Sequence, residues 1–136
     1  MSDTVREDKE KMQALLTEIA GALMEILPEN WNKVTVGYFL TGEDRASRMQ
    51  VIASAGRAET DLMEKAWKQR SMRGSLRAAE DAAHRLHEHC AAAGDDWSEM
   101  TFVLKRSGDF TTDYRYEPIA AYDGAFILDW QSRALD

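Results

Sequence analysis

Residues 84–90, HRLHEHC, contain the side-chain types that most often bind zinc. On a helix, each residue is turned by about 100° from the one before it, so His84 and His87 share one side. His89 then projects about 200° round from His87, and Cys90 lies on the apolar stripe. One helix cannot direct all four side chains to a single ion, and no second cluster supplies partners. We predict two solvated histidines and a core cysteine, and no metal site.

Carboxylates are the other candidates for chemistry. Asp109, Asp113 and Glu117 recur at a spacing of four on a predicted strand pair, which spreads them along it. General acid–base catalysis needs carboxylates that converge in a cleft with shifted pKa values. The sequence has no GxSxG context for a serine nucleophile, no P-loop and no GxGxxG. We therefore predict that the protein is not an enzyme and needs no cofactor.

Acidic residues are concentrated in the last third of the chain. The net charge is −7, and residues 95–136 hold nine acids and four bases, a net charge of −5. Phosphates require lysine and arginine, so direct binding to nucleic acid is not expected, whereas a basic protein partner is. The predicted partner-binding surface comprises Asp95, Asp96, Glu99, Asp109, Asp113 and Glu117.

The four tryptophans divide into two groups. Trp31, Trp97 and Trp130 stand at element boundaries beside apolar stripes, which predicts core packing. Trp67 instead lies among basic residues in a segment without a clear pattern. Because tryptophan is enriched at interface hot spots, we add Trp67 to the predicted partner contacts.

The length of 136 residues suits one domain, residues 1–136, that buries a core without disulfides. The apolar runs are too short to span a bilayer, and the N-terminus has no signal-peptide core. The single cysteine cannot form an internal disulfide. These features predict a cytoplasmic protein that has no membrane contact, and they leave the oligomeric state open.

Hydrophobic spacing predicts the elements that position these residues. A helix with a stripe from Met12 to Leu27 ends at Pro28, and strands near residues 34–40 and 49–53 form a hairpin. Residues 54–75 are basic and lean toward helix, with a break predicted at residues 71–75. A clearer helix then runs to Gly94, the expected left-handed cap.

A second hairpin follows, and its register can be predicted. A three-residue loop, residues 106–108, places Leu104 opposite Phe110 and keeps the aromatic residues on one face. Residues 122–135 have helical spacing. The sum is an α+β domain with an antiparallel sheet of about four strands (two hairpins) and helices on one face, in the order α-β-β-(α)-α-β-β-α.

Three parts of the sequence together resemble the YezG-like immunity protein (antitoxin) family, over roughly residues 10–135. These are a Pro-Glu-x-Trp opening to the first strand, a late hairpin with a glycine before aromatic residues, and a C-terminal tryptophan. The matching residues are Pro28, Glu29, Trp31, Gly108, Phe110, Tyr114, Tyr116 and Trp130. Residues 54–75 depart from the family, whose members carry a further strand there.

The resemblance implies a small cytoplasmic protein without catalysis that neutralises a cognate polymorphic toxin, in some members a nuclease. It transfers no catalytic residues, because the family shares no catalytic set. Two alternatives stay open from the sequence. One is a non-inhibitory adaptor or chaperone, and the other is a small metal-dependent hydrolase that uses His84 and His87.

Overall fold

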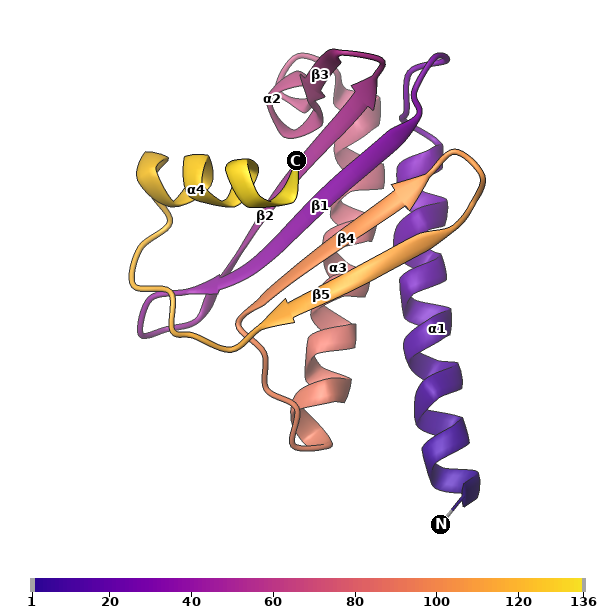
Figure 1. The fold of residues 1–136 in the computed structure, drawn as a ribbon, viewed down its shortest axis with the longest axis vertical. Coiled ribbons are helices and arrows are strands. Elements are labelled where there is room, and N and C mark those ends of the chain that lie inside the picture. The colour runs from indigo at the N-terminus through magenta and orange to yellow at the C-terminus, as the bar shows by residue number, and fades with distance from the viewer. Residues whose placement is uncertain (1, 136) are drawn as a thin grey trace.

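A computed structural model describes residues 2–135 of the chain, and side chains from residue 8 onward. Five antiparallel strands form one sheet in the order β3-β2-β1-β4-β5, and the described residues also form four helices (Figure 1). The strands are β1 (Lys33–Thr41), β2 (Ala46–Ala55), β3 (Ala58–Asp61), β4 (Glu99–Lys105) and β5 (Phe110–Arg115). The helices are α1 (Ser2–Met24), α2 (Leu62–Ala66), α3 (Arg70–Ala92) and α4 (Gly124–Ala134). The α+β class is confirmed, with one strand more than predicted.

The main core lies between one face of the sheet and the long helices α1 and α3 (Figure 1). The stripe of α1 is buried at Leu15, Leu16, Ile19 and Leu23. Alternate residues of the central strands point at it, because successive side chains of a strand face opposite ways. These strand residues include Val34, Val36, Tyr38, Met100, Phe102 and Leu104, all buried.

Helix α4 covers the opposite face of the sheet, so the prediction that all helices lie on one face is wrong (Figure 1). Phe39, Ile52 and Trp130 form a second buried cluster there. The Trp130 ring lies against β1, and its Nε1 donates a hydrogen bond to Thr101 Oγ1 at 3.0 Å. Adjacent aromatic residues Tyr38 and Phe39, both fully buried, indicate that β1 is covered on both faces.

Residues 54–75 differ from the prediction in two ways. They contain the short strand β3, so this chain does not lack the further strand expected of the family. Asp61 then begins α2, its side chain accepting hydrogen bonds from the backbone of Met63 and Glu64. The change of helical phase falls at residues 67–69, between α2 and α3, and α3 continues through Gly74 without the predicted break.

The β4–β5 hairpin has the predicted register. Leu104 pairs with Phe110, Phe102 with Thr112 and Met100 with Tyr114. Gly108 has a φ of +97°, the left-handed conformation that the three-residue loop requires. The core face of this hairpin is therefore set by sequence pattern alone. Among the described residues, every helix is too short or too polar to cross a membrane.

Candidate partner-binding site

Four of the acidic and aromatic residues gather at one end of the sheet, where β4 begins and β5 ends. We call Asp95, Asp96, Tyr116 and Glu117 the sheet-end site. The Tyr116 hydroxyl donates to Asp95 Oδ1 at 2.5 Å, and the Ser98 hydroxyl donates to the Glu117 carbonyl at 2.6 Å. These bonds connect the loop after α3 to the segment after β5. The sequence prediction included three of these residues, and the structure adds Tyr116, which is 55% exposed.

Asp96 is the most tightly paired member of the sheet-end site. Arg45 Nη1 donates to its Oδ2 at 2.7 Å, and His87 Nε2 lies 2.9 Å from its Oδ1. The Arg45 hydrogen bond holds the pKa of the Asp96 carboxyl below its usual value, and His87 adds to the effect. The side chain is still half exposed. Its negative charge is therefore locally offset but remains accessible.

Arg45 also contributes to the sheet-end site, although no sequence pattern indicated it. It lies in the β1–β2 turn with a φ of +52°, unusual for a residue with a Cβ. Besides Asp96, its guanidinium donates to the Trp97 carbonyl at 3.2 Å. This contact could not be predicted from the sequence, because residues 45 and 96 are far apart in the chain. Only the folded sheet brings the β1–β2 turn beside the loop that follows α3.

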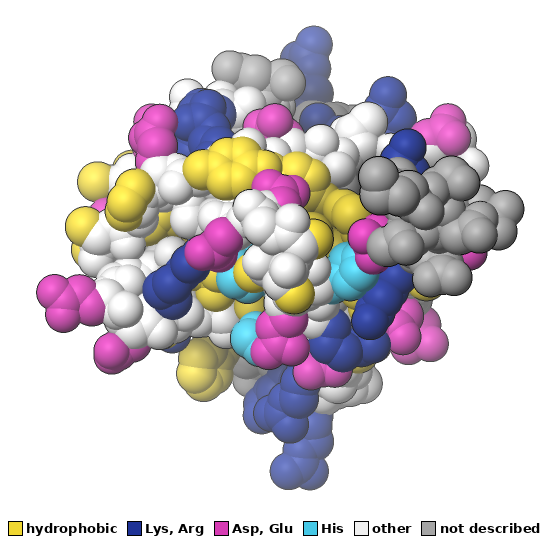
Figure 2. All heavy atoms as spheres, turned by 90° about the horizontal axis from the view of Figure 1, so that it is seen from below, with side chains coloured by type: hydrophobic (Ala, Val, Ile, Leu, Met, Phe, Trp, Pro, Cys, Tyr) yellow, Lys and Arg dark blue, Asp and Glu magenta, His cyan; other side chains and the backbone are white. Residues whose placement is uncertain are grey.

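A hollow of about 580 Å³ opens next to the sheet-end site. The β1–β2 turn and residues 116–120 form its walls, and Glu43, Arg45, Asp96 and Tyr116 are among its lining residues. Figure 2 views the molecule from this end and shows acidic, basic and histidine side chains interleaved. The surface is thus a mixed-charge depression rather than a continuous acidic field.

The three histidines of α3 point to three different carboxylates. The nearest carboxylate oxygens belong to Glu88 for His84, Asp96 for His87 and Asp8 for His89. Within residues 8–135, no three His, Cys, Asp or Glu side chains are placed to hold a metal ion. His87 is only 12% exposed and packs edge-on against Trp97 at 4.8 Å. The prediction that His87 is solvated is wrong, because the Trp97 ring shields it from solvent. The spacing of residues along the chain does not indicate this contact.

Glu99 lies outside the accessible part of the predicted surface. It is 3% exposed and accepts hydrogen bonds from both terminal nitrogens of Arg133, at 3.2 and 3.3 Å. Arg115 Nε is a further 3.8 Å neighbour. The Glu99 hydrogen bonds raise the pKa of Arg133. Glu99 therefore connects β4 to α4 inside the protein.

The two remaining acids of the prediction stand apart from the sheet-end site. Asp113 is exposed in the middle of β5, opposite Thr101. Asp109 is exposed in the β4–β5 turn, where it accepts a hydrogen bond from Ser107 at 3.2 Å. The eight residue-to-residue steps from Asp109 to Glu117 span roughly 26 Å if extended. The structure thus lays these acids along one edge strand instead of gathering them.

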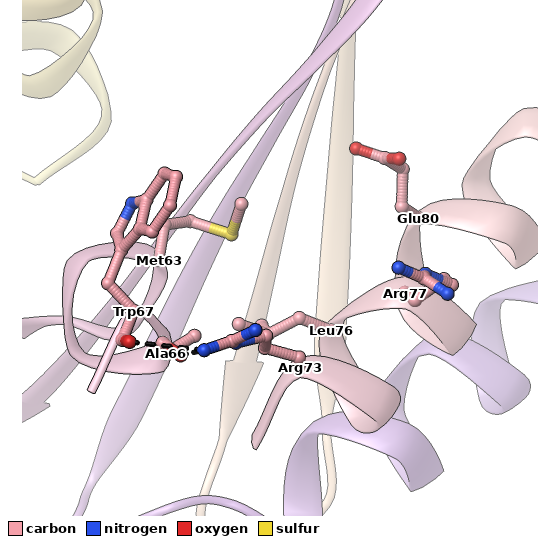
Figure 3. Close-up of a pocket in the computed structure, with 7 residues that line it drawn as sticks. All are labelled: Met63, Ala66, Trp67, Arg73, Leu76, Arg77 and Glu80. Atoms are coloured by element: carbon pink, nitrogen blue, oxygen red, sulfur yellow. Dashed lines mark hydrogen bonds between the residues drawn. The ribbon is translucent and has the colours of Figure 1, made fainter. Parts of the chain in front are cut away.

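Trp67 lies on a separate surface. It is 81% exposed, the largest value among the exposed large hydrophobic side chains of the described residues. It borders a hollow between α2 and α3 (Figure 3). Helix α2 lies at the end of α3 opposite to the sheet-end site (Figure 1). The predicted core packing of Trp31, Trp97 and Trp130 is confirmed, since all three are buried.

Comparison with known proteins bears on this arrangement. The model of one protein family, described as "Immunity protein YezG-like", matches residues 12–130. No curated protein matches the chain. The matched region runs from α1 to Trp130 in α4 and so includes the whole sheet and the sheet-end site. The chain belongs to the YezG-like immunity protein family.

Proposed function

We propose that this protein neutralises a cognate polymorphic toxin in the cytoplasm by stoichiometric binding that blocks the toxin domain. The family match over residues 12–130 carries the proposal. It is supported by the net charge of −5 over residues 95–136, which suits a basic partner. A nuclease toxin is such a partner, because it needs a basic groove for phosphate.

The proposed contact surface joins the sheet-end site to the exposed acids of β5. Asp95, Asp96, Asp113 and Glu117 lie on it, and Asp109 extends it as far as the hairpin turn. The hollow beside Asp96 offers room for an incoming lysine or arginine side chain. Each carboxylate oxygen of Asp96 has a second acceptor position beyond its bond to Arg45 or His87.

Complementary charge favours rapid encounter, up to about 10⁸–10⁹ M⁻¹s⁻¹ at low salt. The association rate with the toxin is therefore expected to fall as salt rises. Glu99 is not part of this contact, because it is buried beneath Arg133.

The experiment begins with a tagged pull-down from the native strain and native mass spectrometry of the complex. We expect one predominant partner, near one-to-one, with a toxin-like C-terminal domain. That domain expressed alone should stop growth, and co-expression of this protein should restore it. A partner that binds without harming cells when this protein is removed would contradict the proposal and support an adaptor role.

Charge neutralisation then tests the surface. Asp109→Asn, Asp113→Asn and Glu117→Gln together should slow association and flatten its salt dependence. The matched control is Glu29→Gln, Glu59→Gln and Glu64→Gln, which changes the net charge equally at other exposed acids. Equal effects of the two triple variants on association would remove this edge from the proposed interface.

A further inference from the structure

The corner between α2 and α3 has a charge opposite to that of the whole molecule. Residues 62–80 hold five bases and two acids, a net charge of +3 in a chain of net charge −7. The five exposed bases are Lys65, Lys68, Arg70, Arg73 and Arg77. We call them, with Trp67 and the hollow beside it, the basic corner.

The bases of this corner have no acidic partners among residues 8–135. Elsewhere, Arg45, Arg85, Arg115 and Arg133 all form ion pairs with Asp or Glu. Arg73 instead donates to the carbonyls of Ala66 and Trp67, at 3.0 and 3.2 Å. These bonds brace α2 against α3 and leave the guanidinium charge unneutralised. The corner therefore presents a concentrated positive charge.

The same corner contains an apolar hollow of about 270 Å³. Met63, Ala66 and Leu76 line it, while Trp67 and Arg77 stand at opposite sides (Figure 3). Small-molecule sites typically have volumes of about 300–1,000 Å³, so this hollow suits one or two side chains better than a cofactor. A tryptophan that is 81% exposed at its rim offers a large rigid contact surface.

We infer that the basic corner is a docking site for an acidic protein segment with an apolar anchor residue. Trp67 and the hollow would receive the anchor, and the surrounding bases would pair with flanking carboxylates. Nucleic acid fits less well, because Glu80 lies in the lining of the hollow and would face phosphate. The inference does not depend on whether the partner is a toxin.

Helix α3 separates this corner from the sheet-end site. Its 23 residues extend roughly 33 Å, with the corner along its first three turns and Asp95 shortly after its last turn. The two surfaces are therefore distinct sites, and variants of one should not alter contacts at the other.

The test uses the full chain, labelled with ¹⁵N, and three synthetic peptides of twelve residues. Each peptide has a central Leu-Phe pair, flanked by Asp and Glu, by Lys, or by Ser. We expect only the acidic peptide to shift the Trp67 indole resonance, with weaker binding at high salt. Arg77→Glu should weaken binding about tenfold, and Trp67→Ser by at least as much.

The matched control is Arg48→Glu, an exposed arginine on β2 that changes the net charge equally. The Arg48→Glu variant should lose far less affinity for the acidic peptide than the Arg77→Glu variant. Three results would overturn the inference: no preference for the acidic peptide, equal loss in the two variants, or shifts at Trp67 caused by a short oligonucleotide instead. Shifts that grow with protein concentration alone would assign the corner to a second copy of this chain.

Discussion

At the scale of single residues, Gly37 decides how closely α4 can approach the sheet. It lies in the middle of β1 on the face that Trp130 covers. A Cβ at this position would collide with the Phe39 ring and lie 2.6 Å from Trp130 Cζ2. Only glycine lets the indole lie against the backbone and reach Thr101. Glycine is therefore required here by the close approach of the Trp130 ring to the backbone, and not by a turn.

Gly37→Ala is expected to destabilise the protein by about 1–3 kcal/mol, because it forces overpacking against two rings. Urea unfolding at equilibrium measures the change. Gly21→Ala is the control, since a Cβ there meets nothing within 4 Å. That variant removes a flexible residue from α1 and should be stabilised by about 0.5–1 kcal/mol. A neutral Gly37→Ala would mean that α4 does not pack on β1 as described.

The lowered pKa of Asp96 predicts a dependence of stability on pH. A carboxyl whose pKa is lower when folded contributes stability above its unfolded pKa, about 3.9. That contribution is lost as pH falls through the folded value. Thermal midpoints of the wild type and Asp96→Asn should therefore differ at pH 6 and converge below about pH 4.

Asp113→Asn is the comparison for this experiment, because the Asp113 side chain forms no ion pair or hydrogen bond with residues 8–135. Its midpoint should follow the wild type at every pH. A gap between the wild type and Asp96→Asn that persists undiminished at pH 3 would contradict the assigned role of the Arg45 and His87 contacts.

At the scale of elements, α4 is attached to the sheet by apolar packing and by an ion pair. Trp130 packs against Phe39 with ring centres 5.5 Å apart, while Arg133 pairs with buried Glu99. Asp123 begins the helix by accepting a hydrogen bond from the Phe126 backbone at 2.9 Å. The helix thus depends on a charge pair that is mostly shielded from water.

Arg133→Ala should cost about 3 kcal/mol, because it leaves the Glu99 carboxylate buried with only the more distant Arg115. Chemical denaturation monitors the loss. The double variant Glu99→Met/Arg133→Met removes both charges and should recover most of the stability. If it is as unstable as Arg133→Ala, the pair is not the source of the cost.

The elements that the sequence predicted share strong periodicity. Stripes and alternation identified α1, most of α3 and both hairpins, and a glycine specified the β4–β5 turn. Strand β3 was not predicted, because four residues are too short to show a period. Helix α2 was predicted only as a helical tendency within residues 54–75, because its five residues also show no clear period. The covering of the second sheet face was also missed, although Tyr38 and Phe39 carried a signal for it.

The candidate site was less predictable than the fold. The sequence showed where acids are concentrated but not which of them find internal partners. Glu99 is buried beside Arg133, and Asp96 pairs with Arg45, which lies 51 residues away in the chain. Such pairs depend on strand order, so composition alone cannot separate accessible charge from compensated charge.

At the scale of the whole molecule, two apolar clusters share one strand. Tyr38 belongs to the core under α1 and α3, and the next residue, Phe39, to the cluster under α4. Separation of β1 from its neighbours would expose both clusters together. The two sides of the sheet are therefore expected to unfold in one transition.

The indole N–H resonances of Trp97 and Trp130 test this expectation, because each reports on one side of the sheet. Both should lose native intensity at the same urea concentration. Earlier loss at Trp130 would show instead that α4 detaches as a separate unit.

The side chains of strand β5 alternate between the core and the solvent. Phe110 and Tyr114 pack against the core, whereas Thr111 and Asp113 point into solvent between them. The outward pair can be exchanged for other polar residues without disturbing what lies beneath. In the proposed interface, the residues that would contact a partner and the residues that support the core are therefore different members of one strand. The outward residues could then change to match an altered partner at little cost in stability.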